Sequence, residues 1–367
     1  MARHELWLAR DDGTRLALID TVVSFAYSIV VHDVGVCSLV LPGSYDAELM
    51  QPDRRIDVLR DGVLQRVYLV RRRIDQVDRR GIRSLKVVAY DGNYLLGNPS
   101  KTSGRIVAYN AASPQADVSG PADDLLKEVI RDNLGADALT ARQISTTYLT
   151  VQANSSSGPT ITKAFSYRNV LAVLQDLVLE AREAGTDVYW DVAPVSQMAW
   201  EFRTSTGQPG RDHTYPGGNP PVHLSYEEGT LAEPVLDEDW TDEATFVYAG
   251  GQGEEDARII ETAEDTARSG RSIFGRRERF IDARQETSSD AVQAAAYQAL
   301  SEGRPSSRFA ARILDQPGCQ YGLHWSWGDK VTAVYRGRSF DCVIRSVAVS
   351  VDSNGKETVS AALEVDS

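Results

Sequence analysis

The residues with the clearest potential for chemistry are a histidine motif and a glycine motif, and neither has the companions that a reaction needs. Asp212-His213 could form half of a catalytic dyad, but no GxSxG or other nucleophile signature accompanies it. Gly250-Gly251-Gln252-Gly253 follows an expected strand, as a phosphate-binding loop does, but no helix pattern follows directly and no Lys-Ser/Thr pair is present. We interpret these motifs as a hydrogen-bonded loop histidine and a flexible or partner-contacting loop.

Carboxylates, histidines and cysteines predict no cofactor or metal site. Three acidic clusters could hold Ca²⁺ or supply glycosidase acids: Glu227-Glu228, Asp237-Glu238-Asp239 and Glu254-Glu255-Asp256. None has the DxDxDG order of a calcium loop, and a glycosidase pair cannot be recognised from one sequence. Solvated acidic loops are the favoured interpretation. The histidines are never at HExxH spacing, and Cys37, Cys319 and Cys342 form no CxxC pair.

The candidate contact residues are arginines and tryptophans. Arg71-Arg72-Arg73 and Arg276-Arg277 have Asp or Glu nearby, so we expect them to pair across subunit contacts instead of binding phosphate. Trp325 and Trp327 lie two residues apart on a predicted strand and so project to one face. Two roles remain open for the tryptophans: they cap the core of a C-terminal barrel, or they anchor an interface.

The elements that position these residues include two β-meanders with matching turns. The first runs from Asp53 to Asp91 with glycine turns after 9 and a further 19 residues; the second runs from Asp329 to Asp366 with glycine turns after 8 and a further 18. A short strand, a turn, one long strand, a second turn and a closing strand therefore occur twice. A duplicated small β-barrel would leave this pattern. The alternative is that any two meanders look alike, because regular turn spacing is common in all-β domains.

The remaining pattern divides the chain into three parts. Residues 1–98 are almost wholly β, and we predict a first β-barrel domain there. Residues 99–221 contain helix patterns at Ala122–Leu134 and Asn169–Ala184, then a hairpin, and end in the Gly/Pro-rich loop Thr206–Pro221. Residues 222–367 carry the second meander and one Ala-rich helix, Ser289–Glu302, and form a second predicted barrel domain. The expected fold class is mainly β, with two similar small β-barrels per chain and an α+β insertion.

Length and charge limit the classes of function. The chain has 367 residues and a net charge of −13, which argues against a basic nucleic-acid-binding surface. An acidic wall that nucleic acid passes without sticking remains compatible with this charge. No apolar run reaches membrane-spanning length, and charged residues occupy the place of a signal peptide's apolar centre. The sequence predicts a soluble chain that is not conventionally secreted and does not insert into a membrane.

Several segments resemble one protein family. RRERFIDAR at Arg276–Arg284, the Ala-rich helix ending in AALSEGRP, and the stretch from YGLHWSWGDK to VIRSVAVSV are similar to the C-terminal half of tail-tip hub proteins of long-tailed phages. These are the minor tail or baseplate hub proteins, in particular those of phages that infect actinobacteria. The upstream segments VGVCSLVLPGSYDAELMQPDRRIDVLRDG, RIVAYNAASPQADVSGPADDLLKEVIRDN and GRDHT are similar to the same family. The motifs record strands and turns and not a reaction.

The resemblance implies a structural, non-enzymatic virion protein at the distal end of the tail. It implies a homotrimer that caps the hexameric tail tube and forms part of the DNA-ejection channel. The implied partners are the tail tube protein, the distal tail protein, the tape-measure protein and tip or fibre proteins, with DNA passing through the lumen without specific binding. Three chains with two similar barrels each would present six faces to a sixfold tube.

Two other classes of function remain as alternatives. One is a cell-wall or polysaccharide hydrolase that uses carboxylates from the acidic loops, although some related tail-tip proteins carry such activity in a further domain and this sequence ends at Ser367, directly after the meander. We therefore expect enzymatic activity to come from a partner. The other is a receptor- or saccharide-binding tail module, with Trp325, Trp327 and the Gly/Pro loop at the contact, which would need an exposed aromatic patch.

Overall fold

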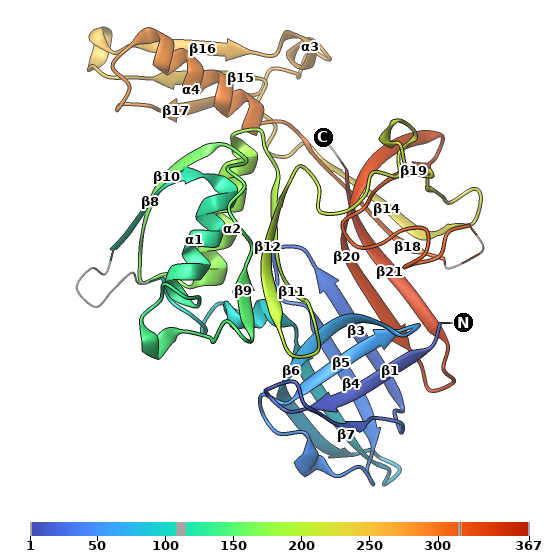
Figure 1. Ribbon diagram of the computed structural model, residues 1–367. Helices are drawn as coiled ribbons and strands as arrows, with labels where there is room; N and C mark the ends of the chain where they lie inside the picture. Colours follow the sequence, from blue (N-terminus) through green and yellow to red (C-terminus); the bar gives the residue numbers. More distant parts are fainter. Residues whose placement is uncertain (1, 108–114, 315, 317, 366–367) are drawn as a thin grey trace. The chain divides into compact units, whose positions relative to one another are not determined.

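The computed structural model describes residues 2–107, 115–314, 316 and 318–365. The chain forms two compact units, a large one from residues 2–234 and 310–365 and a small one from residues 235–309. The described part is mainly β with few helices, which confirms the predicted class (Figure 1). Residues 108–114 of the resembling segment that begins RIVAYN, and Asp366 at the end of the second meander, lie outside the described residues.

One 13-stranded sheet forms the framework of the large unit. Its first strands are β1 (His4–Ala9), β2 (Arg15–Leu18), β3 (Ser24–Val30), β4 (Val36–Pro42), β5 (Arg55–Arg60), β6 (Val63–Val77) and β7 (Arg83–Tyr90). Its later strands are β13 (His223–Ser225), β14 (Leu231–Asp239), β18 (Ser306–Ile313), β19 (Lys330–Tyr335), β20 (Arg338–Val351) and β21 (Glu357–Val365). β3, β4 and β7 alternate buried residues with more exposed ones, as strands with one face on a core must.

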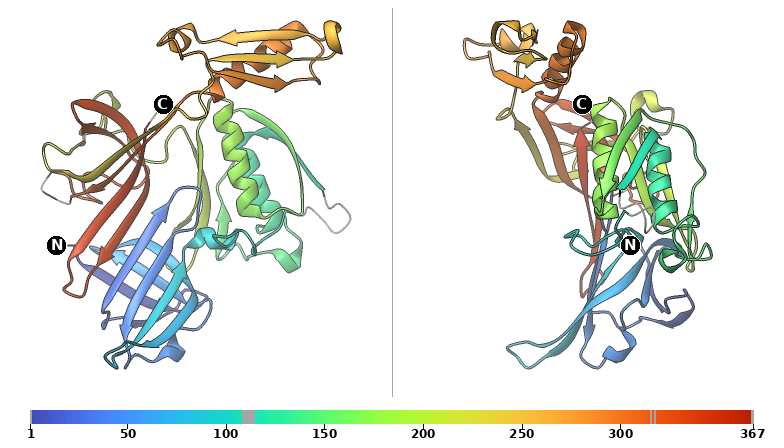
Figure 2. Two further views of the ribbon diagram at one scale, coloured as in Figure 1. Left: turned by 180° about the vertical axis from the view of Figure 1, so that it is seen from behind. Right: turned by 90° about the vertical axis from the view of Figure 1, so that its left-hand side faces the viewer.

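The strand order shows how the two groups are joined. It runs β14-β18-β21-β20-β3-β4-β7-β6-β5-β1-β2, and β19 pairs with both β20 and β13. β3 thus bonds directly to β20, and Figure 2 shows the N-terminal strands (blue) adjoining the C-terminal strands (red). The pairings of the described strands form an open path and do not by themselves close either group into a barrel.

The two meanders predicted from the sequence share one order of strand pairing. β6 pairs with β5 along its first half and with β7 along its second half. β20 pairs with β19 and β21 in the same way. Each long strand carries a one-residue bulge near the point where its partner changes, at Arg71 in β6 and at Arg345 in β20. β6 has a further bulge at Gln65, opposite β5, which β20 lacks.

The turns of the two meanders also match. Asp61-Gly62 and Arg336-Gly337 have positive φ at both residues, as the two-residue turn that suits hairpin twist requires. At the other end, residues 78–82 and 352–356 form turns in which Gly81 N donates to Asp78 O and Gly355 N to Asp352 O, each at 3.0 Å. The two meanders thus agree in the order of strand pairing, in the bulge where the partner changes and in their turns.

An α+β insertion follows the first meander. It contains α1 (Ala122–Asn133), α2 (Val170–Glu183), β8 (Gln115–Pro121), β9 (Leu149–Val151), β10 (Thr160–Ser166), β11 (Val188–Pro194) and β12 (Trp200–Thr206). The predicted helices are confirmed to within a residue at each end. The side chain of Asn169 caps α2 by accepting a hydrogen bond from Ala172 N, and Gly185 follows its end with φ +83°. The apolar stripe of each helix is buried in a core shared with β11 and β12.

A loop of mostly exposed residues, 152–159, links β9 to β10 and is held at the start of α1. The carboxylates of Asp123 and Asp124 in the first turn of α1 accept hydrogen bonds from the backbone N–H groups of Ser157 (2.6 Å) and Ser155 (3.0 Å). The chain then enters β10, which pairs with β8. The loop is held because two carboxylates beside it need hydrogen-bond donors.

The small unit is a two-layer structure. β15 (Phe246–Gly250) lies between β16 (Ile260–Glu264) and β17 (Glu278–Asp282), and α4 (Ser289–Glu302) packs on the sheet; α3 is Thr266–Ser269. Ser288 caps α4 by accepting a hydrogen bond from Ala291 N at 3.3 Å, so the predicted bounds of this helix are confirmed. Among the described residues, short 3₁₀ turns occur at Ala47–Leu49, Gly92–Leu95, Thr140–Arg142, Tyr215–Gly217 and Glu255–Ala257. None of the helices in the described ranges is long and apolar enough to cross a lipid bilayer.

Candidate functional site

The seam between the repeated halves of the large unit is the pairing of β3 with β20. It runs from Val30 opposite Ser346 to Phe25 opposite Val351. Tyr27 and Val347 on these strands are buried. Because the two strands share both backbone hydrogen bonds and buried apolar area, neither half is expected to fold without the other.

A buried charged cluster spans the same seam. The guanidinium of Arg60 on β5 donates to both carboxylate oxygens of Glu357 on β21, at 2.9 and 3.1 Å, and to Tyr321 O at 2.7 Å. The Arg60 and Glu357 side chains are only 9% and 7% exposed. His4 Nε2 lies 3.1 Å from Glu357, and burial lowers the pKa of His4 even though Glu357 opposes the shift. The ion pair therefore ties residues 297 positions apart in the sequence.

The two candidate tryptophans lie in different environments. Trp325 is 2% exposed, contacts Tyr321 and donates its indole N–H to Cys319 O at 3.3 Å. Trp327 is half-buried and lines a pocket. The predicted strand from Tyr321 to Trp327 is wrong, because Gly322 and Gly328 adopt positive φ and fold this stretch into turns. Trp325 thus belongs to the core.

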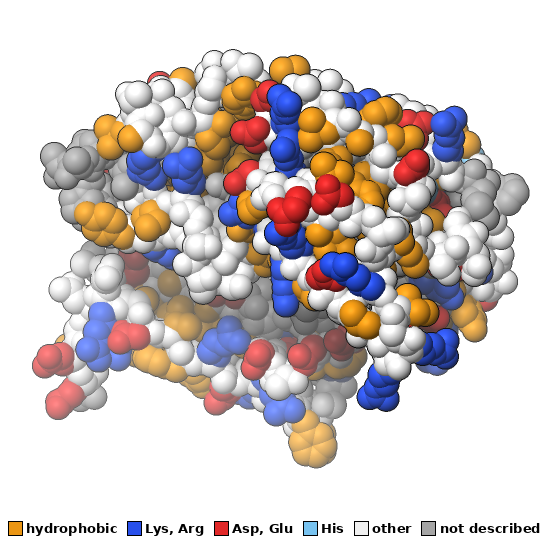
Figure 3. All heavy atoms as spheres, turned by 90° about the horizontal axis from the view of Figure 1, so that it is seen from below, with side chains coloured by type: hydrophobic (Ala, Val, Ile, Leu, Met, Phe, Trp, Pro, Cys, Tyr) orange, Lys and Arg blue, Asp and Glu red, His pale blue; other side chains and the backbone are white. Residues whose placement is uncertain are grey.

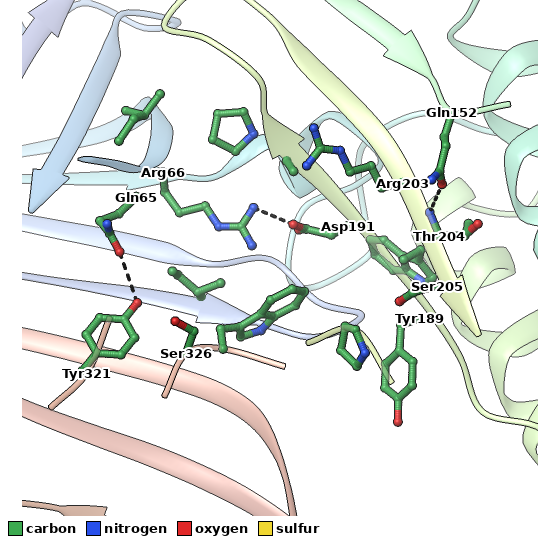
Figure 4. Close-up of a pocket in the computed structure, with 17 residues that line it drawn as sticks. Gln65, Arg66, Gln152, Tyr189, Asp191, Arg203, Thr204, Ser205, Tyr321 and Ser326 are labelled. Carbon is green, nitrogen blue, oxygen red and sulfur yellow. Dashed lines mark hydrogen bonds and ion pairs between the residues drawn. The ribbon is translucent and has the colours of Figure 1, made fainter. Parts of the chain in front are cut away.

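That pocket has a cavity volume of about 410 Å³ and is lined by β6, β11, β12 and the turns around Trp327 (Figure 4). Arg66 of β6 forms an ion pair with Asp191 of β11 at 2.8 Å and lies over the Trp327 ring at 5.6 Å. Gln65 accepts a hydrogen bond from the Tyr321 hydroxyl at 3.3 Å. Within the described residues, Arg66 Nε, Asp191 Oδ1 and the indole nitrogens of Trp190 and Trp327 are buried without a hydrogen-bond partner.

The buried residues next to the pocket carry strongly shifted pKa values. Burial raises the pKa of Asp91 to about 8, although Arg66 partly offsets this shift. For Arg66, burial acts to lower the pKa, but Asp191 and Asp91 hold the pKa above its ordinary value. Asp91 ends the first meander and is fully buried. Asp91 is thus mostly neutral near pH 7.

The arginine candidates fall in three settings. Arg71 pairs with Asp53 and lies over Tyr94, and Arg73 pairs with Glu48 at 3.1 Å. Arg72 is exposed, and the described residues offer it no ion-pair partner. In the small unit, Arg276 pairs with Glu278 at 2.6 Å and covers the Phe246 ring, while the backbone N–H of Arg277 donates to Thr245 Oγ1. Each of these arginines other than Arg72 therefore has a local structural role.

The histidine motif is held in a hydrogen-bonded loop, as predicted. His213 Nδ1 lies 2.8 Å from Pro220 O, and its Nε2 lies 3.5 Å from Asp329. The neighbouring Asp212 instead accepts hydrogen bonds from Thr214. Asp329 also accepts from the backbone of Arg211 and Ser326, each at 2.7 Å, so it anchors the Gly/Pro loop beside β19.

The glycine and acidic motifs have structural roles as well. A Cβ at Gly251 would lie 2.4 Å from Val292 Cγ2, so this glycine permits the close approach of α4. Glu227 accepts hydrogen bonds from Ser225 Oγ and from the backbone of Arg336, which fixes the turn between β19 and β20. Within the described ranges, no group of three or more His, Cys, Asp or Glu could hold a metal ion.

The surface charge is mixed on the face seen in Figure 3. Lys and Arg side chains alternate there with Asp and Glu, and apolar groups lie between them. This face therefore has no extended field of one sign, in keeping with many local ion pairs on an acidic chain.

Sequence reasoning found Trp327 but missed the ion pairs that join the halves and line the pocket. Arg60 pairs with Glu357, and Arg66 pairs with Asp191, across long separations in the sequence. A single sequence offers no local signal for such pairs. The only hint was the repeat itself, which places Arg60 and Tyr335 at corresponding ends of β5 and β19.

Comparisons with known proteins agree on one group. A family model described as Siphovirus ReqiPepy6 Gp37-like protein matches residues 5–363. A tail protein from Neisseria meningitidis has 12% identity and a TM-score of 0.60, with 99% of this chain and 97% of that chain covered. The 43 kDa tail protein of prophage MuSo2 from Shewanella oneidensis has 12% identity and a TM-score of 0.60, with 98% of each chain covered.

A third solved structure, prophage tail protein gp18 from Listeria monocytogenes, has 10% identity and a TM-score of 0.54, covering 98% of this chain and 94% of that one. At these identities the structural likeness shows the fold alone. No curated protein matches the sequence.

Proposed function

Because the chain belongs to the siphovirus tail-protein family described as ReqiPepy6 Gp37-like, we propose that it is the trimeric hub at the tip of the tail. The family membership makes it a structural protein of the phage tail, and so places it in the virion tail. The proposal adds that three copies form a ring that caps the hexameric tail tube and encloses part of the DNA-ejection channel.

One observation supports the trimer above the others: the chain contains the same meander twice, with the same bulge and the same turns. A sixfold tube presents six equivalent sites to whatever docks on it. Three copies of a chain with two equivalent halves offer six matching faces, whereas three copies of a chain without a repeat offer only three. The repeat therefore gives a physical reason for a threefold object on a sixfold tube.

The proposed domain division follows from this repeat. Residues 1–98 and 222–367 would each complete a small barrel in the assembled ring, and residues 99–221 would form the α+β insertion between them. The small unit at residues 235–309 begins within β14 and ends within β18, and these two strands are neighbours in the sheet. It is thus an insertion within the second repeat.

The proposed partners are those of a tip hub: the tail tube protein, the distal tail protein, the tape-measure protein and tip or fibre proteins. DNA would pass through the lumen without specific binding, because a chain of net charge −13 repels phosphate on average. No enzymatic activity of its own is proposed, since His213 and Glu227 are engaged in holding loops.

Light scattering coupled to size-exclusion chromatography tests the trimer. The molar mass measured for the eluting protein is expected to be three times that of the 40.3 kDa subunit. A monomer or a dimer over the whole accessible concentration range would speak against the hub. Purified peptidoglycan incubated with the same sample is expected to remain intact.

A second candidate function, binding of a saccharide unit, is favoured by the pocket at Trp327. Three unsatisfied N–H donors and one unsatisfied carboxylate oxygen lie around one cavity. A hydroxyl group both donates and accepts, so a neutral polyol fits this set better than an anion, which Asp191 repels, or a cation, which Arg66 repels. Ligand-observed NMR with host-wall oligosaccharides should show binding that Trp327→Ala removes and that Trp240→Ala, an exposed tryptophan of the small unit, leaves intact. Equal binding by both variants would reject this site.

A further inference from the structure

The two long strands, β20 and β6, differ in how much of one edge is paired with a neighbouring strand. In β20, residues 338–343 pair with β19 and residues 346–351 pair with β3. In β6, residues 63–69 pair with β5 on the corresponding edge. Beyond the bulge at Arg71, that edge of β6 has no neighbouring strand among the described residues. Residues 72–77 of β6 are thus the counterpart of the stretch of β20 that β3 occupies.

The strand equivalent to β3 in the second half is also open on one side. The sheet order β3-β4-β7-β6-β5 in the first half corresponds to β14-β18-β21-β20-β19 in the second. β3 is therefore matched by β14, which pairs with β18 but has no strand on its other edge within the described ranges. An open strand edge presents unpaired N–H and C=O groups that favour pairing with another chain.

We infer that β14 of one copy pairs with residues 72–77 of β6 in the next copy, and so repeats between chains the β3–β20 pairing found within each chain. The inference rests on the proposed trimer and specifies the contact between neighbouring subunits. The contact is head-to-tail, and such contacts close into a ring when each step has the same rotation. If the step within a chain and the step between chains are equivalent, six halves from three chains complete the ring.

The charges of the two segments suit this pairing. β3 runs antiparallel to β20, with Val30 at the end of β3 opposite Ser346 just after the bulge. If β14 of one copy runs antiparallel to β6 of the next in the same way, the acidic end of β14 lies beside Arg72 and Arg73, just after the bulge of β6. This acidic end is Asp237-Glu238-Asp239. Asp237 and Asp239 alternate on the exposed face of β14, so both can approach Arg72.

The opposite ends of the two segments also agree. Val235 and Val77 are 59% and 64% exposed in the single chain, and the antiparallel direction brings them to the same end of the contact. Pairing would therefore cover two exposed apolar side chains. The opposite charges and the two exposed valines favour a partner strand over solvent as the neighbour of this edge of β6.

Pro234 limits the length of the pairing. It lacks a backbone N–H, and Glu233 before it has φ +54°, so the strand is kinked at this point. The pairing segment of β14 is then Val235–Asp239, which is close in length to the segment of β3 that contacts β20. The kink also blunts the free edge against unselective aggregation.

Disulfide trapping in the full-length protein tests this contact between subunits. The native cysteines, Cys37, Cys319 and Cys342, are buried, so introduced thiols dominate the oxidation. The double variants Arg72→Cys/Asp239→Cys and Ile74→Cys/Asp237→Cys should give covalent dimers and circular trimers on non-reducing gels. The matched control Val63→Cys/Asp239→Cys uses an exposed residue in the β5-paired half of β6 and should stay monomeric on the same gels.

Charge inversion provides an independent measurement. Arg72→Glu, or Asp237→Arg/Asp239→Arg, should raise the concentration for half-assembly by roughly tenfold or more, because like charges then face each other. Combining both changes in one chain should restore assembly, which a merely misfolded variant would not do.

The outcomes separate this inference from the proposed function. If trimers form but neither β6–β14 cysteine pair cross-links, and charge inversion does not weaken assembly, the β6–β14 contact is wrong and the proposed trimer is still supported. A chain that stays monomeric and uncross-linked at every concentration contradicts both. Cross-linked trimers with restored assembly in the combined variant support both.

Discussion

The buried pair between Arg60 and Glu357 allows a direct test of how the two repeated halves depend on each other. Replacing Arg60 with Met keeps the apolar length of the side chain but leaves the Glu357 carboxylate uncompensated. It also removes the hydrogen bond to Tyr321 O. Breaking one partner of a buried ion pair typically costs about 3–5 kcal/mol, and since the rim of this pair is slightly exposed we expect about 3 kcal/mol for Arg60→Met.

Urea unfolding followed by tryptophan fluorescence measures this loss. Five of the six tryptophans belong to the large unit, so the signal reports mainly on the sheet that contains the pair. The matched control is Arg83→Met, which breaks the pair between Arg83 and Asp75, whose side chains are 59% and 45% exposed. The control should cost far less than Arg60→Met, because exposed ion pairs are screened.

The double variant Arg60→Met/Glu357→Leu completes the argument. Removing both charges eliminates the uncompensated carboxylate, so most of the loss caused by Arg60→Met should be regained. Equal stabilities for Arg60→Met and Arg83→Met would refute the claim that a buried ion pair joins the halves. A double variant no more stable than Arg60→Met would show that packing and not charge is responsible.

Three further outcomes are expected. The pKa of Asp91 is raised to about 8, so its contribution to stability is complete at low pH and is lost as the pH rises from about 4 to about 8. Asp91→Asn should therefore flatten the dependence of the unfolding free energy on pH, measured by urea unfolding. An unchanged pH dependence would contradict the raised pKa. Leu174→Ala in α2 should cost about 2–5 kcal/mol of unfolding free energy, whereas Leu179→Ala, exposed on the same helix, should change it by less than about 0.5 kcal/mol. Gly251→Ala should destabilise the small unit by about 1–3 kcal/mol, seen as faster hydrogen exchange in α4, and Val292→Ala in the same chain should relieve the clash.

Elements governed by local rules could be predicted from the sequence. The α2 and α4 bounds follow from apolar periodicity and from Asn169 and Ser288 at the caps. The repeated meander follows from glycine turns at matching spacing, since Gly62 and Gly337 adopt the positive φ that such turns require. These signals lie within a few residues of the structure they specify.

Features that depend on distant residues could not be predicted. The β3–β20 seam joins residues more than three hundred positions apart, and nothing near either strand records its partner. The stretch around Trp325 was misjudged because alternating Trp residues suggest a strand, while the positive φ of Gly322 and Gly328 decides the path. The small unit was not separated from the predicted second barrel domain, residues 222–367, because its short strands pack on α4 and give no local signal of a boundary.

Cryo-electron microscopy of the tail tip measures the central claim most directly. The account predicts three copies of this chain in one ring, with β6 and β20 alternating at six equivalent positions around the axis. A density in which β6 and β20 occupy different radii or heights, or in which the number of copies differs from three, would contradict it.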